Sequence, residues 1–229
     1  MDLKQKIISA AYKLFAEKGV EKTTVAEIIE LAGSSKGGFY HHFKSKDEIL
    51  EAITMNYIND LVMEYERILQ DQELTVIELL NLVFLKISEY KIDQIEEWPK
   101  MKILFSFSGN HVILRKLAEQ FELINTDCYL KLFRKGNEEG IFEIEHPEFL
   151  ASLWTREVMM VFNKSRDVVY TEESEALHNF ENLLHFTENL LNQTLGLTSH
   201  QIKIKEAALA YVQSARNEQK RGEGRGKIR

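Results

Sequence analysis

Helical periodicity runs through almost all of this 229-residue chain, and proline interrupts it only twice. Apolar residues recur three or four positions apart, and no segment alternates apolar and polar residues for long enough to form a strand. The two prolines, Pro99 and Pro147, fall where the pattern begins a helix, and proline is tolerated in a first turn. The sequence therefore predicts an all-α protein.

Short helices with well-marked ends are predicted over the first 50 residues. An apolar stripe over residues 3–15 indicates a helix that ends at Gly19. Thr24 and Glu27 have the spacing of a capping box that opens a second helix, and Gly33 ends it. A third short helix is expected over residues 35–42, and a second capping box at residues 45–48 opens a long fourth helix. The later helices are expected over residues 75–92, 99–108, 111–136, 147–165, 173–195 and 199–219.

Charge is distributed unevenly along the chain, whose overall net charge is −7. Residues 1–46 contain eight lysines and five acidic residues, whereas residues 47–215 have a net charge of −14. Residues 216–229 have a net charge of +4. Because nucleic acid repels an acidic protein, we expect any DNA contact at a basic end of the chain.

Several classes of site are not expected. The single cysteine, Cys128, cannot form an intrachain disulfide or a thiolate metal cluster, and it fits a reducing cytosol. Neither a secretory signal nor a run long enough to span a membrane is visible. There is no phosphate-binding glycine loop, nucleophile elbow or HExxH motif, so we expect no catalytic residue and no cofactor. His178, Glu181 and His185 have a spacing that can hold a metal ion, but they are better explained as flanking a dimer interface, and no metal site is predicted.

The two short helices over residues 24–42 are joined by a tight turn that contains glycine, as in a helix-turn-helix. The second helix of such a unit enters the major groove of DNA, which is about 12 Å wide. Lys36 can donate to a guanine edge or to a phosphate, and Gly37 and Gly38 let the backbone approach DNA closely. Phe39 can anchor the helix to the core or meet a thymine methyl group. Further donors on planar rings come from Tyr40, His41 and His42.

The segment from residue 23 to residue 50, TTVAEIIELAGSSKGGFYHHFKSKDEIL, closely resembles the DNA-binding signature of the TetR family of bacterial regulators. Residues 10–19 resemble the first helix of that family. The positions that match at the expected spacing are Gly33, Lys36, Gly37, Tyr40, Phe43, Lys46 and Leu50. Ser34 departs from the pattern, because the family commonly has an apolar residue there.

The resemblance implies a homodimer with a helix-turn-helix domain over residues 1–46 and a ligand-binding and dimerisation domain over residues 47–219. We expect residues 220–229 to be a disordered basic tail. Two chains would pair through the helices near 147–165 and 173–195. A small-molecule effector in the larger domain would release a palindromic double-stranded DNA operator in the bacterial cytoplasm, at the nucleoid.

The family pattern also assigns roles to individual residues of the DNA-binding segment. The base-facing positions are Lys36, Gly37, Gly38 and Phe39. The phosphate contacts are Thr24, Tyr40, His42 and Lys46, with Thr23 and His41 as further candidates.

Candidate residues for an effector pocket are apolar or aromatic positions with a few polar neighbours, although each can equally be plain core. They are Trp98, Met101, Phe105, Phe121, Asn125, Cys128, Tyr129, Trp154, Glu157 and Val158. Glu157 projects from the same helical face as apolar residues and could oppose a cationic ligand, form a salt bridge, or lie exposed at the rim. An apolar face over residues 177–195 predicts pairing between two chains.

Two alternatives to an effector-controlled repressor stay open. One is a helix-turn-helix adaptor that contacts DNA or a protein without a small effector, and the other is an activator. A cavity of several hundred Å³ in the larger domain would favour the effector-controlled regulator, and a filled core would favour the adaptor.

Overall fold

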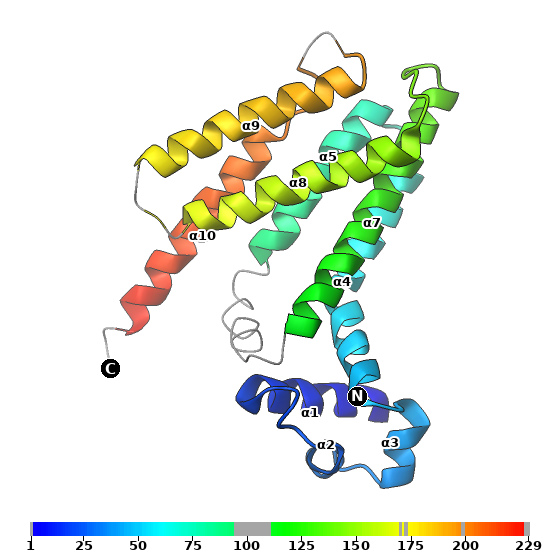
Figure 1. The fold of residues 1–229 in the computed structure, drawn as a ribbon, viewed down its shortest axis with the longest axis vertical. Coiled ribbons are helices and arrows are strands. Elements are labelled where there is room, and N and C mark those ends of the chain that lie inside the picture. Colours follow the sequence, from blue (N-terminus) through cyan, green and yellow to red (C-terminus); the bar gives the residue numbers. More distant parts are fainter. Residues whose placement is uncertain (1, 94–110, 170, 172–173, 198–199, 227–229) are drawn as a thin grey trace. The chain divides into compact units, whose positions relative to one another are not determined.

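The computed structural model describes residues 2–93, 111–169, 171, 174–197 and 200–226, and every regular element in these ranges is a helix (Figure 1). The prediction of an all-α protein is confirmed. The helix expected over residues 99–108 lies outside the described residues. The helices are α1 (Leu3–Lys18), α2 (Val25–Ala32), α3 (Lys36–His42), α4 (Lys46–Gln70), α5 (Val76–Asp93), α7 (His111–Glu138), α8 (Pro147–Val169), α9 (Ser174–Thr194) and α10 (Lys205–Gly226).

The chain divides into two compact units. The first contains Met1–Asp60 and Glu97–Phe121, and the second contains Leu61–Glu96 and Glu122–Arg229. The division into a DNA-binding domain over residues 1–46 and an effector domain over residues 47–219 stays a prediction. Helix α4 begins at Lys46, and its early apolar residues, such as Ile49 and Leu50, are buried.

The ends of α1, α2 and α3 are set by local capping. Gly19 ends α1 with φ of 85°, and Gly33 ends α2 with φ of 62°. Thr24 and Glu27 form the capping box expected at the start of α2. Ser35 caps α3, where its hydroxyl accepts a hydrogen bond from the backbone N–H of Gly38 at 3.0 Å. The core among these helices is made of fully buried apolar side chains, among them Ile7, Ala11, Phe15, Ile28 and Phe39.

The second capping box is only partly formed. Ser45 accepts a hydrogen bond from the N–H of Glu48 at 3.3 Å, as expected. The carboxylate of Glu48 instead accepts from the N–H of Lys44 at 2.7 Å, one residue before the cap. The start of α4 is still satisfied, but by a contact that the four-residue motif does not predict.

In the second unit, α10 packs against α5, α8 and α9, and α8 packs against α9. This arrangement changes the interpretation of the apolar face of α9. Its side chains at Phe180, Leu184 and Leu191 are already buried in a single chain, so they belong to the chain's own core. Pairing of two chains would therefore use other side chains of α8 and α9. Phe186 of α9 is one of them, with 61% of its surface exposed.

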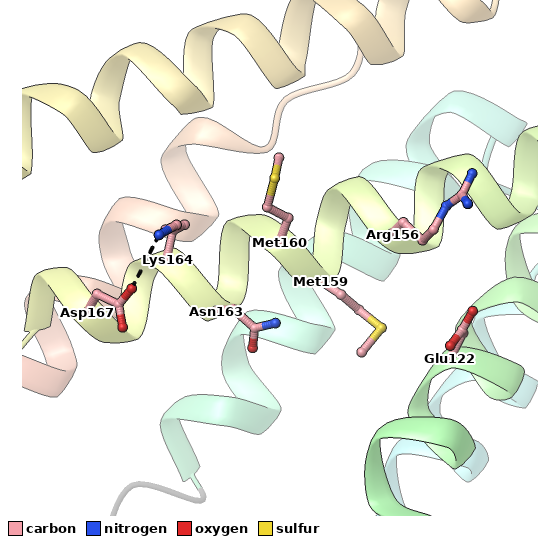
Figure 2. A pocket seen from close by; sticks show the side chains of 7 residues that line it. All are labelled: Glu122, Arg156, Met159, Met160, Asn163, Lys164 and Asp167. Carbon is pink, nitrogen blue, oxygen red and sulfur yellow. Dashed lines mark ion pairs between the residues drawn. The ribbon is translucent and has the colours of Figure 1, made fainter. Parts of the chain in front are cut away.

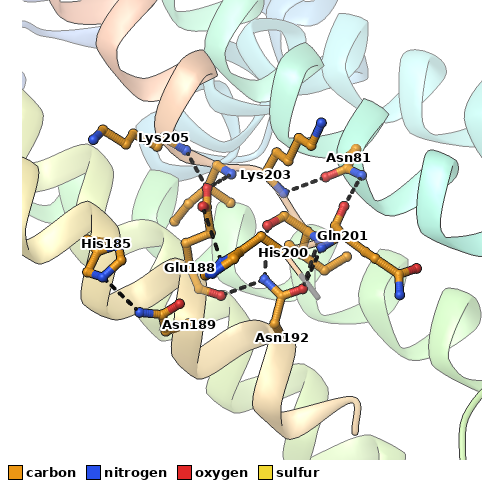
Figure 3. Close-up of polar contacts among 11 residues, drawn as sticks. Asn81, His185, Glu188, Asn189, Asn192, His200, Gln201, Lys203 and Lys205 are labelled. Atoms are coloured by element: carbon orange, nitrogen blue, oxygen red, sulfur yellow. Dashed lines mark hydrogen bonds and ion pairs between the residues drawn. The ribbon is translucent and has the colours of Figure 1, made fainter. Parts of the chain in front are cut away.

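Helix α10 differs from the expected element at both ends. It begins at Lys205, six residues after the expected start, because Glu188 of α9 accepts hydrogen bonds from the N–H groups of Ile204 and Lys205 (Figure 3). The connection before it is held by side chains of Asn192 and Asn81. At the other end the helix extends to Gly226, beyond the expected end at residue 219. Within the described ranges, no helix is both long and apolar enough to cross a membrane.

Candidate nucleic-acid interface

The turn between α2 and α3 depends on Gly33. Its left-handed conformation, with φ of 62°, strains residues that carry a Cβ atom. The N–H of Gly33 donates to the carbonyl of Glu30 at 3.1 Å, and that of Ser34 donates to the carbonyl of Ile29 at 2.9 Å. These bonds close the end of α2 and allow α3 to begin only a few residues later. The helix-turn-helix geometry predicted for this segment is therefore present.

Helix α3 presents an exposed surface that includes Lys36, Gly37, Tyr40 and His41, with His42 half-buried. Tyr40 has 49% of its surface exposed. Neither Lys36 nor Lys44 has an acidic partner within the described residues. The surface thus offers a free ammonium group and ring donors, the groups that bind DNA bases and phosphates.

Phe39 does not belong to this exposed surface, although the sequence made it a base-facing candidate. Its side chain is fully buried, with its ring centroid 5.3 Å from that of Tyr40 and 6.4 Å from that of Phe43. Of the two roles considered for it, the structure supports the core anchor, because a fully buried ring has no access to a thymine methyl group.

Gly37 and Gly38 are glycines for different reasons. A Cβ atom on Gly38 would lie 3.1 Å from Leu3 Cδ2 and 3.1 Å from Ser34 Oγ, which is tighter than ordinary contact. A Cβ on Gly37 would meet only Ser35 Oγ, at 4.0 Å. Glycine inside a helix costs about 1 kcal/mol relative to alanine, and nothing within the described chain requires it at position 37. The close approach to DNA expected at Gly37 stays a prediction.

Lys46, the first residue of α4, contacts the connection between α1 and α2, which contains Thr23. The ammonium group of Lys46 donates to the carbonyl of Val20 at 2.7 Å and to that of Thr23 at 2.8 Å. Two of its three N–H groups are thereby used to attach α4 to this connection. The Thr23 side chain is 1% exposed, and its hydroxyl donates to the carbonyl of Gly19 at 2.8 Å. Sequence reasoning missed these contacts of Lys46 because they join residues 26 and 23 positions apart.

Thr24 is exposed at the start of α2, and its capping partner is strongly acidic. The hydroxyl and the backbone N–H of Thr24 both donate to Glu27 Oε2 at 2.8 Å. The ammonium group of Lys18 also donates to the Glu27 carboxylate, and together these contacts lower the pKa of Glu27 to about 2. Glu27 is therefore an anion whose charge is compensated by donors of its own domain.

The effector-pocket candidates fall into three groups. Trp98, Met101 and Phe105 lie outside the described residues, and Phe121 and Glu157 are half-buried. Glu157 has no ion pair within the described residues, so its proposed role toward a cation stays a prediction. The buried candidates, which lie on α7 and α8, are Asn125, Cys128, Tyr129, Trp154 and Val158.

The buried candidates form an aromatic and polar cluster. The ring centroid of Trp154 lies 5.6 Å from that of Tyr129 and 5.0 Å from that of Phe133. The hydroxyl of Tyr65 donates to Asn125 Oδ1 at 2.7 Å. Burial raises the pKa of the Cys128 thiol to about 12, so this cysteine is a neutral thiol rather than a reactive thiolate at physiological pH.

The histidines of α9 have local partners. His178 Nε2 lies 3.2 Å from Asn182 Nδ2, and His185 Nε2 lies 3.2 Å from Asn189 Nδ2. Both histidines are exposed. In the described part of the chain, no group of His, Cys, Asp or Glu side chains is arranged to hold a metal ion.

A pocket of about 390 Å³ lies between α7 and α8 and is open to solvent (Figure 2). Its one internal ion pair joins Lys164 Nζ and Asp167 Oδ2 at 3.7 Å. None of its lining residues is among the sequence candidates, because they are mostly polar. The signal that could have found them is the spacing of the α8 members along one helical side. The lining residues are Glu122, Arg156, Met159, Met160, Asn163, Lys164 and Asp167.

Comparison with known proteins agrees with this geometry. Residues 7–53 match the model of the family described as bacterial regulatory proteins, tetR family. The chain is 36% identical over 161 residues to the HTH-type transcriptional repressor KstR2 of Rhodococcus jostii. This alignment covers 68% of this chain and 75% of that protein. It is 22% identical over 195 residues to the HTH-type transcriptional regulator QacR of Staphylococcus aureus, covering 84% and 98%. The solved structure of a SmeT–triclosan complex has the same fold, with a TM-score of 0.56, 24% identity, and coverage of 85% and 90%.

An exposed second helix of a helix-turn-helix, in a chain whose described regular elements are all helices, is typical of a DNA-binding transcriptional regulator. This class of protein is not enzymatic. The chain belongs to the TetR family of bacterial regulatory proteins.

Proposed function

We propose that this regulator is a repressor that binds a palindromic DNA operator as a homodimer and is released by a small-molecule effector. It acts in the bacterial cytoplasm, at the nucleoid. The observation that carries the proposal is Gly37, an exposed glycine on α3 that the chain's own packing does not require. The relative from Rhodococcus jostii is named a repressor, which supports repression over activation.

The proposed contacts follow from exposure. Lys36 and the backbone at Gly37 and Gly38 face the bases. The phosphate contacts come from Thr24, Tyr40, His42 and the remaining N–H of Lys46, with His41 as a further candidate. Thr23 and Phe39 act from inside the domain, since they are 1% and 0% exposed. The lysine contacts to DNA, from Lys36 and Lys46, release counterions, so affinity should fall as salt rises.

Effector control is supported by the larger unit. The pocket between α7 and α8, about 390 Å³ in volume, lies within the range of small-molecule sites, whereas an adaptor without an effector needs no such space. A reporter assay separates the remaining alternatives. Deleting the gene should raise expression from the target promoter if the protein represses, and lower it if the protein activates.

The test of the DNA site begins with selection of an operator from random duplexes by the full-length protein. We expect an inverted repeat, because a symmetric dimer presents two copies of α3. Lys36→Ala should then cost about 1–3 kcal/mol of binding free energy and relax base preference at one position of each half-site. Fluorescence anisotropy at several salt concentrations measures both effects.

Lys13→Ala is the matched control, because Lys13 is an exposed lysine of α1 in the same unit. It removes the same charge without touching α3. Base preference should be unchanged in this variant. If both variants weaken binding equally and neither changes the selected sequence, α3 is not the reading helix.

A further inference from the structure

Lys46 is the first residue of α4, a place where a positive charge is normally unfavourable. The N-terminus of a helix carries a partial positive charge from its free N–H groups, so acidic residues are favoured there. Asp47 and Glu48 follow this preference in the same turn. Within the described residues, the ammonium group of Lys46 has no carboxylate partner. The presence of a lysine here is therefore explained by its other contacts.

Those contacts are with two backbone carbonyls on a closed turn, that of Val20 at 2.7 Å and that of Thr23 at 2.8 Å. The turn has hydrogen bonds of its own. The N–H of Thr23 donates to the carbonyl of Val20 at 3.2 Å, and its hydroxyl donates to the carbonyl of Gly19 at 2.8 Å. Val20 and Thr23 are 8% and 1% exposed. Lys46 is thus attached to a buried turn whose shape is fixed by its own bonds.

This attachment joins the two ends of the helix-turn-helix. Thr23 directly precedes Thr24, the residue that caps α2, and Lys46 comes shortly after the end of α3. The chain from Thr23 through α2 and α3 to Lys46 therefore returns to its starting point, where the hydrogen bond to the carbonyl of Thr23 closes it. We call this closed segment, residues 23–46, the helix-turn-helix ring. A rotation of α3 away from α2 would have to break the closing bond or move the start of α4.

Apolar packing and ring closure restrain α3 in different ways. Phe39 and Phe43 are buried and hold α3 in the core of the domain. Apolar burial is non-directional, whereas hydrogen bonds depend on both distance and angle. The two bonds of Lys46 therefore restrict the orientation of α3 more closely than the apolar core does.

Orientation matters more for reading a sequence than for binding DNA in general. Contacts to base edges need side chains at defined distances and angles, and they alone distinguish one sequence from another. Contacts to phosphates carry no sequence information and supply most of the affinity for random DNA. A small change in the orientation of α3 should therefore weaken binding to the operator more than binding to an unrelated duplex.

We propose that Lys46 is a positioning residue that determines sequence discrimination, because it presents α3 to the bases by closing the helix-turn-helix ring. This role uses two N–H groups inside the domain and is separate from the phosphate contact proposed for the third. The inference rests on the proposed operator binding. It names a residue that touches no base and on which the preference for the operator depends.

The test compares the selected operator with a shuffled duplex of the same length and composition. Fluorescence anisotropy of the full-length protein at several salt concentrations gives both affinities. Lys46→Met should lower the ratio of operator affinity to shuffled-duplex affinity about tenfold. Lys44→Met is the matched control, because Lys44 is an exposed lysine of the same unit that closes no ring. It should leave the ratio unchanged, since loss of a charge alone weakens binding to every duplex by the same factor.

Thr23→Val tests the ring without a change of charge. Valine has nearly the shape of threonine and lacks the hydroxyl that bonds to the carbonyl of Gly19. The affinity ratio should fall as in Lys46→Met, while the salt dependence of binding should equal that of the wild type. Circular dichroism measures the folded fraction of each variant. Partial unfolding would lower both affinities by one factor and would not change their ratio.

Amide hydrogen exchange in the free protein gives a readout that needs no DNA. The N–H of Phe39 donates to the carbonyl of Ser35, and that of Phe43 donates to the carbonyl of Phe39, both at 2.9 Å. Exchange of these two amides should be about tenfold faster in Lys46→Met than in the wild type, because opening of α3 is no longer restrained by the ring. Lys44→Met should exchange at the wild-type rate.

Either of two results would overturn the inference. One is an equal loss of affinity for the operator and the shuffled duplex in Lys46→Met, which would leave the phosphate contact as the whole role of this lysine. The other is exchange of the Phe39 and Phe43 amides at the wild-type rate in that variant. A wild-type protein that prefers no duplex would instead contradict the proposed operator binding, and the exchange measurement would still decide whether Lys46 restrains α3.

Discussion

At the scale of single residues, two glycines of the helix-turn-helix illustrate different constraints. A Cβ atom on Gly33 would meet no atom within 4 Å, but the φ of +62° at this position disfavours any side chain. Gly37 has ordinary helical backbone, and a Cβ atom there would also be free of close contacts. Conformation therefore explains the first glycine, whereas the second is explained by the DNA contact proposed for it.

Gly37→Ala should fold with stability equal to the wild type or higher by up to about 1 kcal/mol, because alanine is the better helix former. Its affinity for the selected operator should fall by about tenfold or more, because the added methyl group holds the α3 backbone away from DNA. Thermal unfolding and anisotropy titration measure the two effects. Gly33→Ala is the comparison, and it should lose about 1–2 kcal/mol of stability through backbone strain. Unchanged operator affinity in Gly37→Ala would contradict the close approach.

At the scale of elements, the first turn of α2 combines a cap with an ion pair. Glu27 accepts from the backbone and hydroxyl of Thr24 and from Lys18 of α1. These contacts act on the ionised carboxylate, so they attach the start of α2 to α1 only while Glu27 is charged. Lys46 attaches the start of α4 to the α1–α2 connection in a similar way. The reading helix is thus positioned by polar contacts at helix ends as well as by its apolar core.

The low pKa of Glu27 predicts a pH dependence with a definite sign. Its folded-state pKa of about 2 lies below the ordinary value of 4.5. The stabilisation is therefore complete above pH 4.5 and is lost as the pH falls toward 2. Glu27→Gln should show a smaller loss of stability than the wild type across this window, measured as thermal midpoint against pH at low salt.

Glu30→Gln is the control for this series. Glu30 is exposed on the same helix and has no ion pair in the described part of the chain. Its variant should follow the wild-type pH curve. Parallel curves for wild type and Glu27→Gln would show that the contacts of Glu27 contribute nothing to stability.

At the scale of the whole molecule, the use of each helical face limits how two copies can pair. The inner face of α9 is buried within one chain, whereas Phe186 is 61% exposed. Met160 and Phe149 of α8 are 37% and 69% exposed. Large exposed apolar side chains on both helices are typical of an interface, and they support a homodimer formed by the outer sides of α8 and α9.

Phe186→Glu should convert the dimer to a monomer at micromolar concentration, because a charge would be buried at the interface. Sedimentation velocity measures the change, and operator affinity should fall with it. Leu123→Glu is the matched control on α7, where the side chain is 62% exposed. That variant should stay dimeric. A Phe186→Glu protein that sediments as a dimer would exclude this interface.

Features that depend on neighbouring residues could be predicted from the amino-acid order. The capping box of Thr24 and Glu27, the stop at Gly33 and the helical start at Pro147 all follow from contacts or backbone preferences within three or four positions. Helix hydrogen bonds are local in the same way. This is why the all-α fold and the helix-turn-helix were predictable from the order of residues.

Contacts between residues that are distant in the chain could not be predicted from the amino-acid order. The burial of Phe39, the attachment of Lys46 to Val20, and the cover over the inner face of α9 come from packing between helices. Periodicity shows that a helix has an apolar face, but it does not identify the surface that covers it. For the same reason, only the packed structure shows that the hydroxyl of Tyr129 is buried among aromatic rings without a partner.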